Sequence, residues 1–300
     1  MTNGVPHISI CIATYQRPLW LGDLLRALVS QQTNGEFTFE IVVTDNDTAE
    51  SGREVVAVQS AASQVPISYS VEPRRSIAYA RNEGLARASG SQIAFIDDDE
   101  LPCADWLLRL FRALRQYKVA AVLGPVRPRF QEGAPRWVIK GGFYDRPEHE
   151  TGHEMPWTEC RTGNVLFDRR IIAGLDPVFS PEFGTGGSDV DFFRRMTLAG
   201  HRFIWCNEAI VHEIVPPNRW KRSVMMRRAL LRGRNSLRHP QGRWVRLAKA
   251  VVAIPLYCLA LPFFAVAGHH VLMRYLIKLC DHVGRLLAAL GITPVRERAM

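Results

Sequence analysis

The first hundred residues alternate between two hydrophobic periods. Four short apolar runs, "HISICIAT", "FEIVVTD", "ISYSVE" and "QIAFID", read as strands over 7–14, 39–45, 67–72 and 92–97. Between them lie helical patterns over 19–31, 53–63 and 76–88; in the first, Leu21, Leu24, Leu25 and Leu28 share one face. Strands that alternate with helices of this length predict a parallel sheet with right-handed crossovers.

Polar residues gather where these strands end. In open α/β sheets ligands bind beyond the carboxyl ends of the strands, so these residues are expected to face one crevice. They are Thr14, Tyr15 and Arg17 after the first strand, Asp45, Asn46 and Asp47 after the second, and Asp97, Asp98 and Asp99 after the fourth. Simple capping of strand ends by turn residues is the alternative, and it suits Asp47 and Thr48 best.

The pattern continues less regularly beyond residue 100. A helix is expected over 105–117 and a strand over 119–126, whereas 125–159 is rich in Pro, Gly and aromatic residues and shows no period. We expect this stretch to be a loop-rich excursion across the mouth of the sheet, of the kind that often carries recognition. "TGNVLFDRRII" restores regular structure, "GGSDVDFFRRMTLAG" is a Gly-rich turn that opens a helix, and "FIWCNEAIVHE" is extended.

The amino-acid composition indicates the class of protein and the cellular compartment. The chain has 300 residues, of which 47% are hydrophobic and 22% charged, as in an ordinary globular protein. Its six cysteines form no C-x-x-C pair, which favours reduced thiols in a cytosolic setting over a disulfide framework or a zinc site. The N-terminal stretch lacks the basic and apolar regions of a signal peptide.

The run "IDDDE" at 96–100 crowds four carboxyl groups at the end of a strand. Two carboxylates about 4 Å apart repel by roughly 4 kcal/mol near a protein surface, so the crowding needs a compensating charge. A hard divalent cation, Mn²⁺ or Mg²⁺, takes oxygen ligands and leaves positions open for substrate phosphates. D-x-D spacing therefore indicates a metal–diphosphate site, although the motif alone is weak.

Five stretches in order strengthen this interpretation. "SICIATYQRP", "EIVVTDND", "ARNEGLARASGSQIAFIDDDE", "TGNVLF" and "GGSDVDFFRRM" together resemble the inverting family-two nucleotide-sugar glycosyltransferases, which have the GT-A fold. The resemblance covers roughly 8–217 and, with "AFIDDDE" and "HEIVPPNRW", is closest to bacterial exopolysaccharide enzymes of the succinoglycan type. It implies an α/β fold with a mostly parallel, Rossmann-like sheet flanked by helices.

The resemblance also implies roles for residues at matching positions. Thr14, Tyr15 and Arg17 would line the nucleotide pocket, and Asp45 would accept a hydrogen bond from the base. The remaining contacts to the nucleotide-sugar would come from Arg81, Asn82, Asp97 and Asp98. Asp98 is alternatively a turn residue only, since relatives often have a small residue there. Gly163 and Asn164 would lie in the acceptor or donor-sugar region. Asp97, Asp99 and His212 would hold the metal, with a purely structural His212 as the alternative.

Inverting transfer needs a base for the acceptor hydroxyl. The family places it in a G-E-D-x-D/E pattern, which here reads Gly187, Ser188, Asp189, Val190, Asp191. Asp189 is thus the expected base, and a helix N-cap is the compatible structural alternative. Ser188 replaces the usual Glu, which puts that residue's part in acceptor binding in doubt. Asp191 belongs to the same acceptor or donor-sugar region and is expected to brace it by pairing with Arg194 or Arg195.

Two further features concern the acceptor. Trp137, Trp157 and Phe143 could stack on sugar faces or simply anchor the core and loops. Processive relatives carry a Q-x-x-R-W signature, whereas this chain keeps Arg219 and Trp220 but has Pro216 at the glutamine position. A single, non-processive addition is therefore expected.

The C-terminal part has a different character. Thirteen of the 38 Lys and Arg residues fall within 214–280, where no Asp or Glu occurs, so the rest of the chain is mildly acidic. No nucleic-acid-binding motif accompanies the charge. Residues 250–268 are uncharged over about the length of a bilayer-spanning helix, although Pro255 and Pro262 leave a re-entrant or tilted segment equally open. The next stretch, 271–290, has the pattern of an interfacial helix. A buried helical hairpin or dimer interface is the soluble alternative.

These observations predict a GT-A catalytic domain over 1–217, with a nucleotide-binding half over 1–100 and an acceptor half over 101–217, and a membrane-associated helical region over 218–300. The expected partners are a nucleotide-diphosphate sugar, uridine-linked, a lipid-linked saccharide and an anionic membrane surface, and nucleic acid is not expected. The expected location is the bacterial inner membrane, with the catalytic domain cytoplasmic. A non-catalytic sugar-binding scaffold is one alternative. A sugar nucleotidyltransferase is another, weakened by "ATYQRP" standing where a Gly-rich loop would follow the first strand.

Overall fold

A computed structural model of the chain describes residues 5–183, 186–237 and 242–292. Within these residues the chain divides into two compact units. The first comprises 5–127 and 146–214, and the second comprises 128–145 and 215–292, apart from the gaps just given. The predicted domain boundary between residues 217 and 218 lies close to the observed division between 214 and 215. Residues 128–145, in contrast, belong to the same unit as the C-terminal residues. The predicted domain ends at 1–4 and 293–300 lie outside the described residues.

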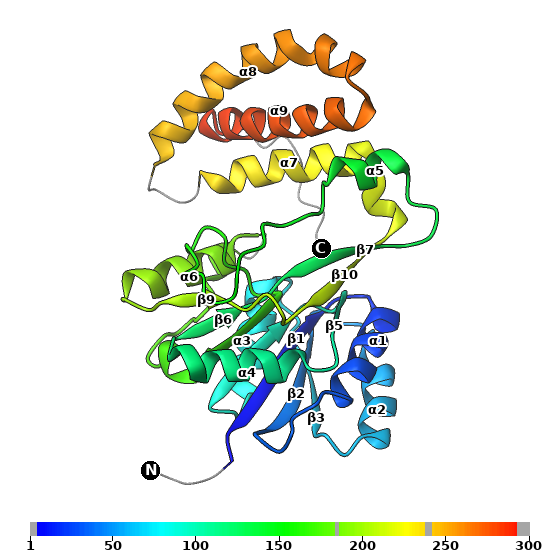
Figure 1. Ribbon diagram of the computed structural model, residues 1–300, viewed down its shortest axis with the longest axis vertical. Coiled ribbons are helices and arrows are strands. Elements are labelled where there is room, and N and C mark those ends of the chain that lie inside the picture. Colours follow the sequence, from blue (N-terminus) through cyan, green and yellow to red (C-terminus); the bar gives the residue numbers. More distant parts are fainter. Residues whose placement is uncertain (1–4, 184–185, 238–241, 293–300) are drawn as a thin grey trace. The chain divides into compact units, whose positions relative to one another are not determined.

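The first unit alternates strands and helices along its N-terminal half (Figure 1). The elements up to residue 130 are β1 (His7–Thr14), α1 (Pro18–Val29), β2 (Thr38–Asp45), α2 (Arg53–Ala62), β3 (Ile67–Val71), α3 (Ile77–Arg87), β4 (Gln92–Ile96), β5 (Glu100–Pro102), α4 (Trp106–Tyr117), β6 (Ala121–Leu123) and β7 (Val126–Phe130). The later elements of this unit are β8 (Asn164–Asp168), α6 (Ser188–Leu198), β9 (Phe203–Trp205) and β10 (Val211–Val215), with short 3₁₀ turns at Arg169–Ile172 and Pro181–Phe183.

Seven strands form the central sheet in the order β3-β2-β1-β4-β8-β6-β9. The first four pair in parallel, as predicted, and the register places Thr14 of β1 beside Asp45 of β2. β8 runs antiparallel to both β4 and β6, and Ile96 of β4 lies opposite Asn164 of β8. A smaller sheet has the order β5-β10-β7. The carboxyl ends of β1, β2 and β4 therefore meet the start of β8 at one edge.

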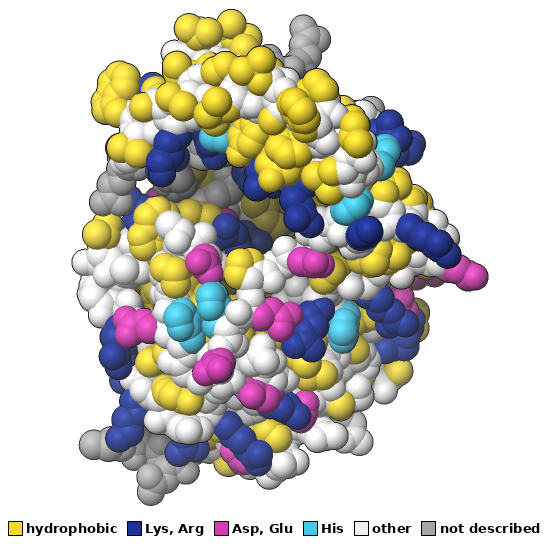
Figure 2. Space-filling model, turned by 45° about the horizontal axis from the view of Figure 1, so that its top comes forward, with side chains coloured by type: hydrophobic (Ala, Val, Ile, Leu, Met, Phe, Trp, Pro, Cys, Tyr) yellow, Lys and Arg dark blue, Asp and Glu magenta, His cyan; other side chains and the backbone are white. Residues whose placement is uncertain are grey.

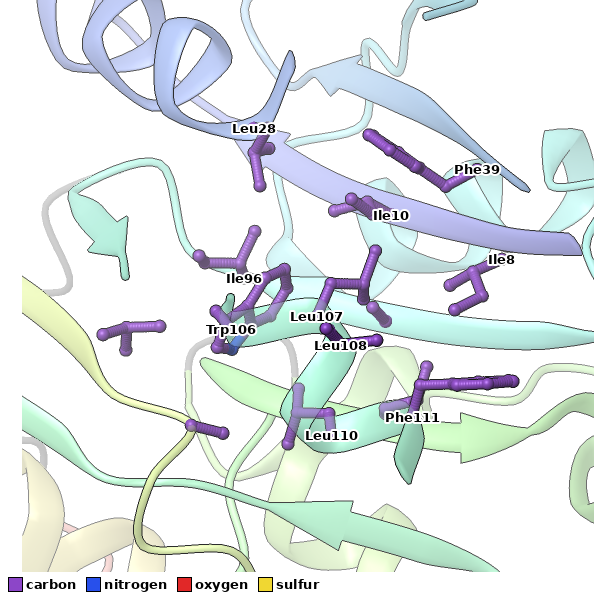
Figure 3. Packing of buried hydrophobic residues seen from close by; sticks show 14 of the residues in the cluster. Ile8, Ile10, Leu28, Phe39, Ile96, Trp106, Leu107, Leu108, Leu110 and Phe111 are labelled. Carbon is purple, nitrogen blue, oxygen red and sulfur yellow. The ribbon is translucent and has the colours of Figure 1, made fainter. Parts of the chain in front are cut away.

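Both faces of the large sheet are buried, as the continuous apolar strands require. Ile8, Ile10 and Ile12 of β1 point to the face covered by α1, α2 and α4, in a core shown in Figure 3. Cys11, between them, points to the opposite face with α3 and α6. This alternation follows from the two-residue period of a strand, and it fixes the register of the polar residues that follow.

The structure confirms the mostly parallel α/β architecture and shifts some predicted boundaries. The first four strands and three helices lie within about two residues of their predicted limits. The stretch 125–159, expected to be loop, contains β7 and a short helix α5 (Arg136–Gly141). The predicted extended segment 203–213 is two strands, β9 and β10, with a turn between them. Pairing between distant strands decides these short elements, so local periodicity did not reveal them.

The second unit is helical. After a 3₁₀ turn at Pro217–Trp220 come α7 (Arg222–Ser236), α8 (Arg243–Val266) and α9 (His269–Ala289). A small core joins α5 to this set through Val138, Val215, Trp220, Met225 and Met273. Trp137 and Phe143 pack on this core, and Trp157 packs on the core of the first unit, so all three are anchored by packing. Helix α8 is the one described helix that is long and apolar enough to cross a membrane, judged by length and composition.

Candidate active site

The carboxyl ends of β1 and β4 are tied together by a buried ion pair. Asp98 accepts a hydrogen bond from Thr14 Oγ1 at 2.8 Å and one from Arg17 Nη1 at 2.6 Å. The same Arg17 nitrogen lies 3.2 Å from Asp99 Oδ2. Arg17 can occupy this place because Pro18 starts α1 immediately after it. Asp98 therefore does more than form a turn: it links the first strand to the D-x-D segment.

The crowding of charges shifts the pKa values of Asp98 and Arg17. Burial raises the pKa of Asp98 to about 6, with Arg17 opposing the rise and the charge of Asp99 adding to it. Burial alone would lower the pKa of Arg17, but the charges of Asp98 and Asp99 raise it above its ordinary value. The guanidinium thus supplies part of the positive charge that the crowded carboxylates need.

Asp97 and Glu100 belong to the next layer of the same cluster. Arg81 Nη2 lies 3.4 Å from Asp97 Oδ1. Although 42% of the Asp97 side chain is exposed, the loss of water on its covered side raises its pKa, while Arg81 opposes the rise and Asp99 adds to it. Glu100 is buried, and burial together with the Asp97 charge raises its pKa well above the ordinary value. Its Oε2 accepts from the Asp97 backbone N–H at 3.0 Å, whereas its Oε1 has no hydrogen-bond partner in the described structure.

A cavity of about 430 Å³ in the first unit is lined by residues from six separate stretches of the chain. Its charged lining residues are Arg81, Asp97, Arg146, Glu159, Arg161 and Asp189. Gly163 and Asn164 line the same cavity, between the end of β4 and the start of α6. The structure therefore brings Asp97 and the expected base Asp189 to one concave site, which is the arrangement that donor and acceptor must share. A larger cavity, about 770 Å³, lies along α3 and 168–178. It contains only Asn82 of the predicted residues.

Asp189 is the second residue of α6, which begins at Ser188 after two glycines with positive φ, Gly186 and Gly187. Its Oδ1 accepts from the N–H of Val190 at 2.9 Å, and its Oδ2 lies 3.9 Å from Arg161 Nε. An acidic side chain in the first turn is favoured by the helix dipole, so the structural and catalytic roles are compatible. Asp191 pairs with Arg195 at 2.8 Å, which confirms the predicted bracing along the helix.

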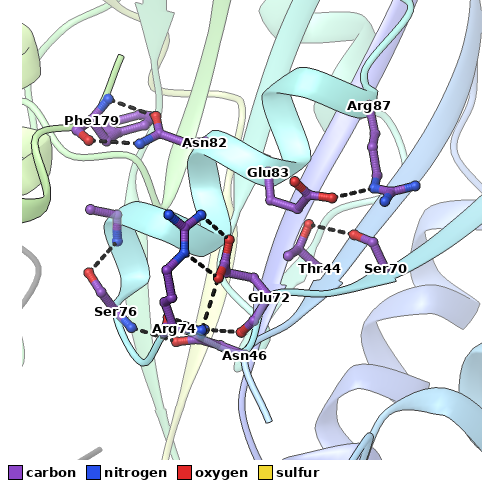
Figure 4. Close-up of polar contacts among 11 residues, drawn as sticks. Thr44, Asn46, Ser70, Glu72, Arg74, Ser76, Asn82, Glu83, Arg87 and Phe179 are labelled. Atoms are coloured by element: carbon purple, nitrogen blue, oxygen red, sulfur yellow. Dashed lines mark hydrogen bonds and ion pairs between the residues drawn. The ribbon is translucent and has the colours of Figure 1, made fainter. Parts of the chain in front are cut away.

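The residues after β2 are engaged by the protein itself. Asp45 is buried and accepts from the N–H groups of Asp47 and Gly52 and from Tyr69 Oη, at 3.0, 2.7 and 2.9 Å. Asn46 bonds the backbone of Glu72, Arg74 and Ser76 (Figure 4). These bonds fix the turn after β2 to the turn after β3. A carboxylate has about four acceptor positions, so Asp45 retains capacity for a further donor.

Three other predicted residues have well-defined internal contacts. Asn82 donates to Phe179 O at 2.8 Å and accepts from Phe179 N at 2.9 Å, a reciprocal pair shown in Figure 4. Asn164 accepts from Trp106 Nε1 at 2.8 Å and donates to the carbonyls of Pro125 and Ala209. Tyr15 accepts a hydrogen bond from Arg75, whose guanidinium also lies over its ring at 4.8 Å. Asn82 thus positions the backbone at Phe179, beside the larger cavity, and Asn164 positions the backbone at Pro125 and Ala209, beside the smaller one.

Gly163 is required at its position by close packing. A Cβ there would lie 2.6 Å from Glu100 Oε1 and 3.2 Å from Asp97 Oδ2. Even alanine would therefore require the Glu100 carboxylate or the backbone to shift where the chain enters β8 beside the D-x-D segment.

The cluster has the oxygen donors that Mn²⁺ or Mg²⁺ prefers. Asp97 keeps 42% of its side chain exposed, and Asp99 lies beside it in the charge cluster. His212 lies in β10 opposite Leu101, with its side chain exposed. In the described part of the chain no three His, Cys, Asp or Glu side chains form a ready ligand set, so His212 is not gathered with the two aspartates. The site fits a cation held by one or two carboxylates together with substrate phosphates and water.

Sequence reasoning missed several groups of this site. Arg146 pairs with Glu213 at 2.6 Å, and the charges of Glu100, Glu213 and Asp97 raise its pKa although burial opposes them. Arg161, beside Asp189, was also not predicted. Glu213 lies opposite Glu100 in the antiparallel pair of β5 and β10. The sequence did not reveal this pairing, so Glu213 could be linked to the cluster only from the structure. Arg146 lies within the aperiodic stretch 125–159 and Arg161 lies just after it, so neither gave a signal in the sequence.

Comparison with known proteins agrees with this geometry. Residues 9–172 match the model of glycosyl transferase family 2. The succinoglycan biosynthesis protein ExoM of Rhizobium meliloti (strain 1021) is 33% identical over 309 residues, covering 99% of this chain and 97% of the relative. Glycosyltransferase AglE of Haloferax volcanii is 26% identical, covering 70% of this chain and 67% of the relative.

Solved structures share the fold. The mannosyltransferase PcManGT from Pyrobaculum calidifontis, in complex with GDP-Man and Mn²⁺, has a TM-score of 0.64 at 18% identity, covering 96% of this chain and 87% of that one. S. aureus TarS 1–349 in complex with UDP has a TM-score of 0.56 at 15% identity, covering 96% of this chain and 93% of the TarS chain. Family match, full-length relative and fold agree: this chain belongs to glycosyl transferase family 2.

Proposed function

We propose that this glycosyltransferase moves one sugar from a nucleotide-diphosphate sugar, uridine-linked, to a lipid-linked saccharide at the cytoplasmic face of the bacterial inner membrane, with inversion at the anomeric carbon. The observation that supports this most is the cavity of the first unit, which Asp97 and Asp189 line together. In this proposal Asp97 would help to hold the donor diphosphate and Asp189 would face the acceptor. The relative ExoM, by its name a protein of succinoglycan biosynthesis, supports a glycan product.

The proposed reaction is a single displacement. The acceptor hydroxyl oxygen attacks the anomeric carbon and its proton passes to an Asp189 carboxylate oxygen, while the bond from that carbon to the diphosphate oxygen breaks and its electrons leave with the diphosphate. Arg81 and Arg146 would add positive charge near the leaving group. Asp97 and Asp99 would hold a divalent cation, which when bound would offset the negative charge of the diphosphate.

The position of Arg161 suits the base. Its guanidinium lies 3.9 Å from Asp189, close enough to help hold that carboxylate in position at the cavity. Its Nη1 also donates to the carbonyls of Thr158 and Cys160, so the loop before β8 holds the guanidinium in place.

The test is a screen of nucleotide-sugars with the purified full chain in detergent, measuring Mn²⁺-dependent release of nucleotide diphosphate. Asp189→Asn should lower turnover about 10²- to 10⁴-fold with the preferred donor. The matched control Asp23→Asn changes a carboxylate on the exposed side of α1 and should leave turnover unchanged.

Two outcomes would contradict the proposal. Full turnover in Asp189→Asn would remove the base assignment. Donor binding without turnover in the wild-type chain, with any donor and a lipid-linked acceptor extract, would instead favour the non-catalytic sugar-binding scaffold.

A further inference from the structure

Helix α8 has an apolar outer face that the second unit does not cover. Seven large apolar side chains on α8 besides Trp244 are each at least 58% exposed, and only 6% of its most apolar window is buried. Most of the seven recur at three- and four-residue spacing, which places them on one side of the helix. They are Val245, Val251, Val252, Leu256, Leu259, Phe263 and Val266. Hydrophobic side chains also gather over this end of the chain in Figure 2, with Lys and Arg bordering them.

The opposite side of α8 packs along α9. Phe264 stacks on Tyr275 with ring centroids 3.6 Å apart, and Tyr257 lies 5.7 Å from both Tyr275 and His282. Phe264, late in α8, contacts Tyr275, early in α9, whereas the earlier Tyr257 reaches the later His282. The two helices are therefore antiparallel neighbours. Gly268, with φ of +118°, joins them. Helix α8 therefore lies flat against α9 and does not project away from it.

The other side of α9 is fixed to the basic helix α7. Arg232 binds Asp281 through two hydrogen bonds, of 2.9 and 2.6 Å. A Cβ on Gly233 would lie 2.1 Å from Asp281 O, and one on Gly284 would lie 2.2 Å from Leu230 O. The two backbones thus touch at paired glycines. Helices α8, α9 and α7 follow one another as layers, and α7, on the far side of α9 from the apolar face, carries the most Lys and Arg residues of the three.

We propose that α8 lies in the plane of one membrane leaflet, with this apolar face in the acyl region, and does not cross the bilayer. At 24 residues, roughly 36 Å, the helix is long enough to span. Spanning would carry the antiparallel α9 with it, including Arg274, Lys278, Asp281 and Arg285. Each such charge costs about 2.5–3.5 kcal/mol at the centre of a membrane helix.

Pro255 and Pro262 favour the same placement. Both are exposed and lie inside α8, where a proline has no N–H for the carbonyl four residues earlier. The carbonyls of Val251 and Cys258 therefore lose their usual helical donor. Water at the headgroup boundary can satisfy such groups, whereas the hydrocarbon core cannot.

Charge identifies lipid as the occupant of this face. Arg243 and Lys249 are exposed in the first two turns of α8, and Arg274 and Lys278 are exposed on α9 beside it. An apolar strip bordered by cations matches acyl chains below anionic headgroups. Trp244 is 79% exposed at the start of α8, a residue type that favours the membrane–water boundary. The lipid-carried acceptor of the proposed function is the reason this face would meet a membrane, and the inference rests on that proposal.

The decisive experiment measures depth along α8. Spin labels are placed one at a time on the full chain through Val245→Cys, Leu256→Cys and Val266→Cys, in a background where the exposed Cys258 is replaced by serine. Vesicles contain phosphatidylglycerol and phosphatidylcholine. All three labels should lie at similar shallow depth, within about 5–10 Å of the headgroup boundary. A deep label at 256 between two shallow ones would show a spanning helix and overturn the inference.

A binding experiment tests the occupant. The double variant Leu256→Asp, Leu259→Asp should float with vesicles at least about tenfold less than wild type. Val58→Asp is the matched control, because Val58 and Leu256 are both 60% exposed and Val58 lies on α2 of the first unit. Unchanged flotation of the double variant, or loss of a dimer in place of flotation, would overturn lipid as the partner.

These readouts are separate from catalysis. Turnover of the double variant with a water-soluble acceptor should equal that of wild type, since α8 holds none of the proposed catalytic residues. Shallow, level labels in a protein without transferase turnover would support the placement while contradicting the proposed function.

Discussion

Replacing Asn82 separates two roles for this residue. The family resemblance makes it a nucleotide-sugar contact, whereas the structure shows its amide engaged with both backbone groups of Phe179, 97 positions along the chain. Phe179 is fully buried and lies just before the turn that leads to α6. Asn82→Ala would therefore leave a backbone N–H and a carbonyl unpaired.

The magnitude follows from these two hydrogen bonds. Each is worth about 1 kcal/mol net, and an unsatisfied buried group costs about 1–3 kcal/mol, so Asn82→Ala should lower the free energy of unfolding by about 2–4 kcal/mol. Asn82→Asp keeps the acceptor for the Phe179 N–H and loses the donor, so its loss should be about half as large.

Thermal unfolding followed by fluorescence gives the stability, and steady-state kinetics gives kcat and KM for the donor. The control Asn218→Ala changes an exposed asparagine outside the first unit and should alter stability by less than about 0.5 kcal/mol. Asn82→Ala should unfold at a clearly lower temperature and also lose kcat, because the segment that leads to Asp189 is no longer anchored. A raised KM for the donor with unchanged stability would refute the anchoring role and restore direct contact.

Three further predictions concern two close packing contacts and one buried hydrogen bond. Gly163→Ala would place a methyl group 2.6 Å from Glu100 Oε1, so affinity for the donor nucleotide should fall at least about tenfold in a fluorescence titration; wild-type affinity would contradict the packing. Trp106→Phe loses the buried bond to Asn164 and should cost about 1–3 kcal/mol in thermal unfolding, a cost that a solvent-exposed indole would not show. Gly284→Val would collide with Leu230 O and should cost about 1–3 kcal/mol, with faster proteolysis between α7 and α9; unchanged proteolysis would contradict the contact.

The N-terminal half of the fold could be predicted because local pattern and global topology agree there. Each strand is a continuous apolar run and each helix has one apolar face, so β1 begins and ends at the predicted residues. The antiparallel β8 and the small sheet of β5, β10 and β7 depend on pairing between distant segments. Short strands of three residues carry too little pattern for the sequence to reveal them.

The candidate site divides in the same way. Asp97 directly follows a recognisable buried strand and Asp189 follows a Gly-rich turn, so their residue types and spacing indicated them. The partners of Asp98, namely Thr14 and Arg17, were predicted as nucleotide contacts, and their mutual bonding appeared only in the structure. Arg146 and Arg161 come from a stretch without a period, where side-chain positions depend on the folded surroundings.

The most direct test of the central claim is calorimetry of nucleotide diphosphate binding in the presence of Mn²⁺. It compares the wild-type chain, the double variant Asp97→Ala, Asp99→Ala and the single variant Asp189→Asn. Wild type and Asp189→Asn should bind equally well, since Asp189 acts on the acceptor, and the double variant should show no measurable binding. Undiminished binding in the double variant, or no binding by the wild-type chain, would contradict the assignment of these carboxylates to the donor.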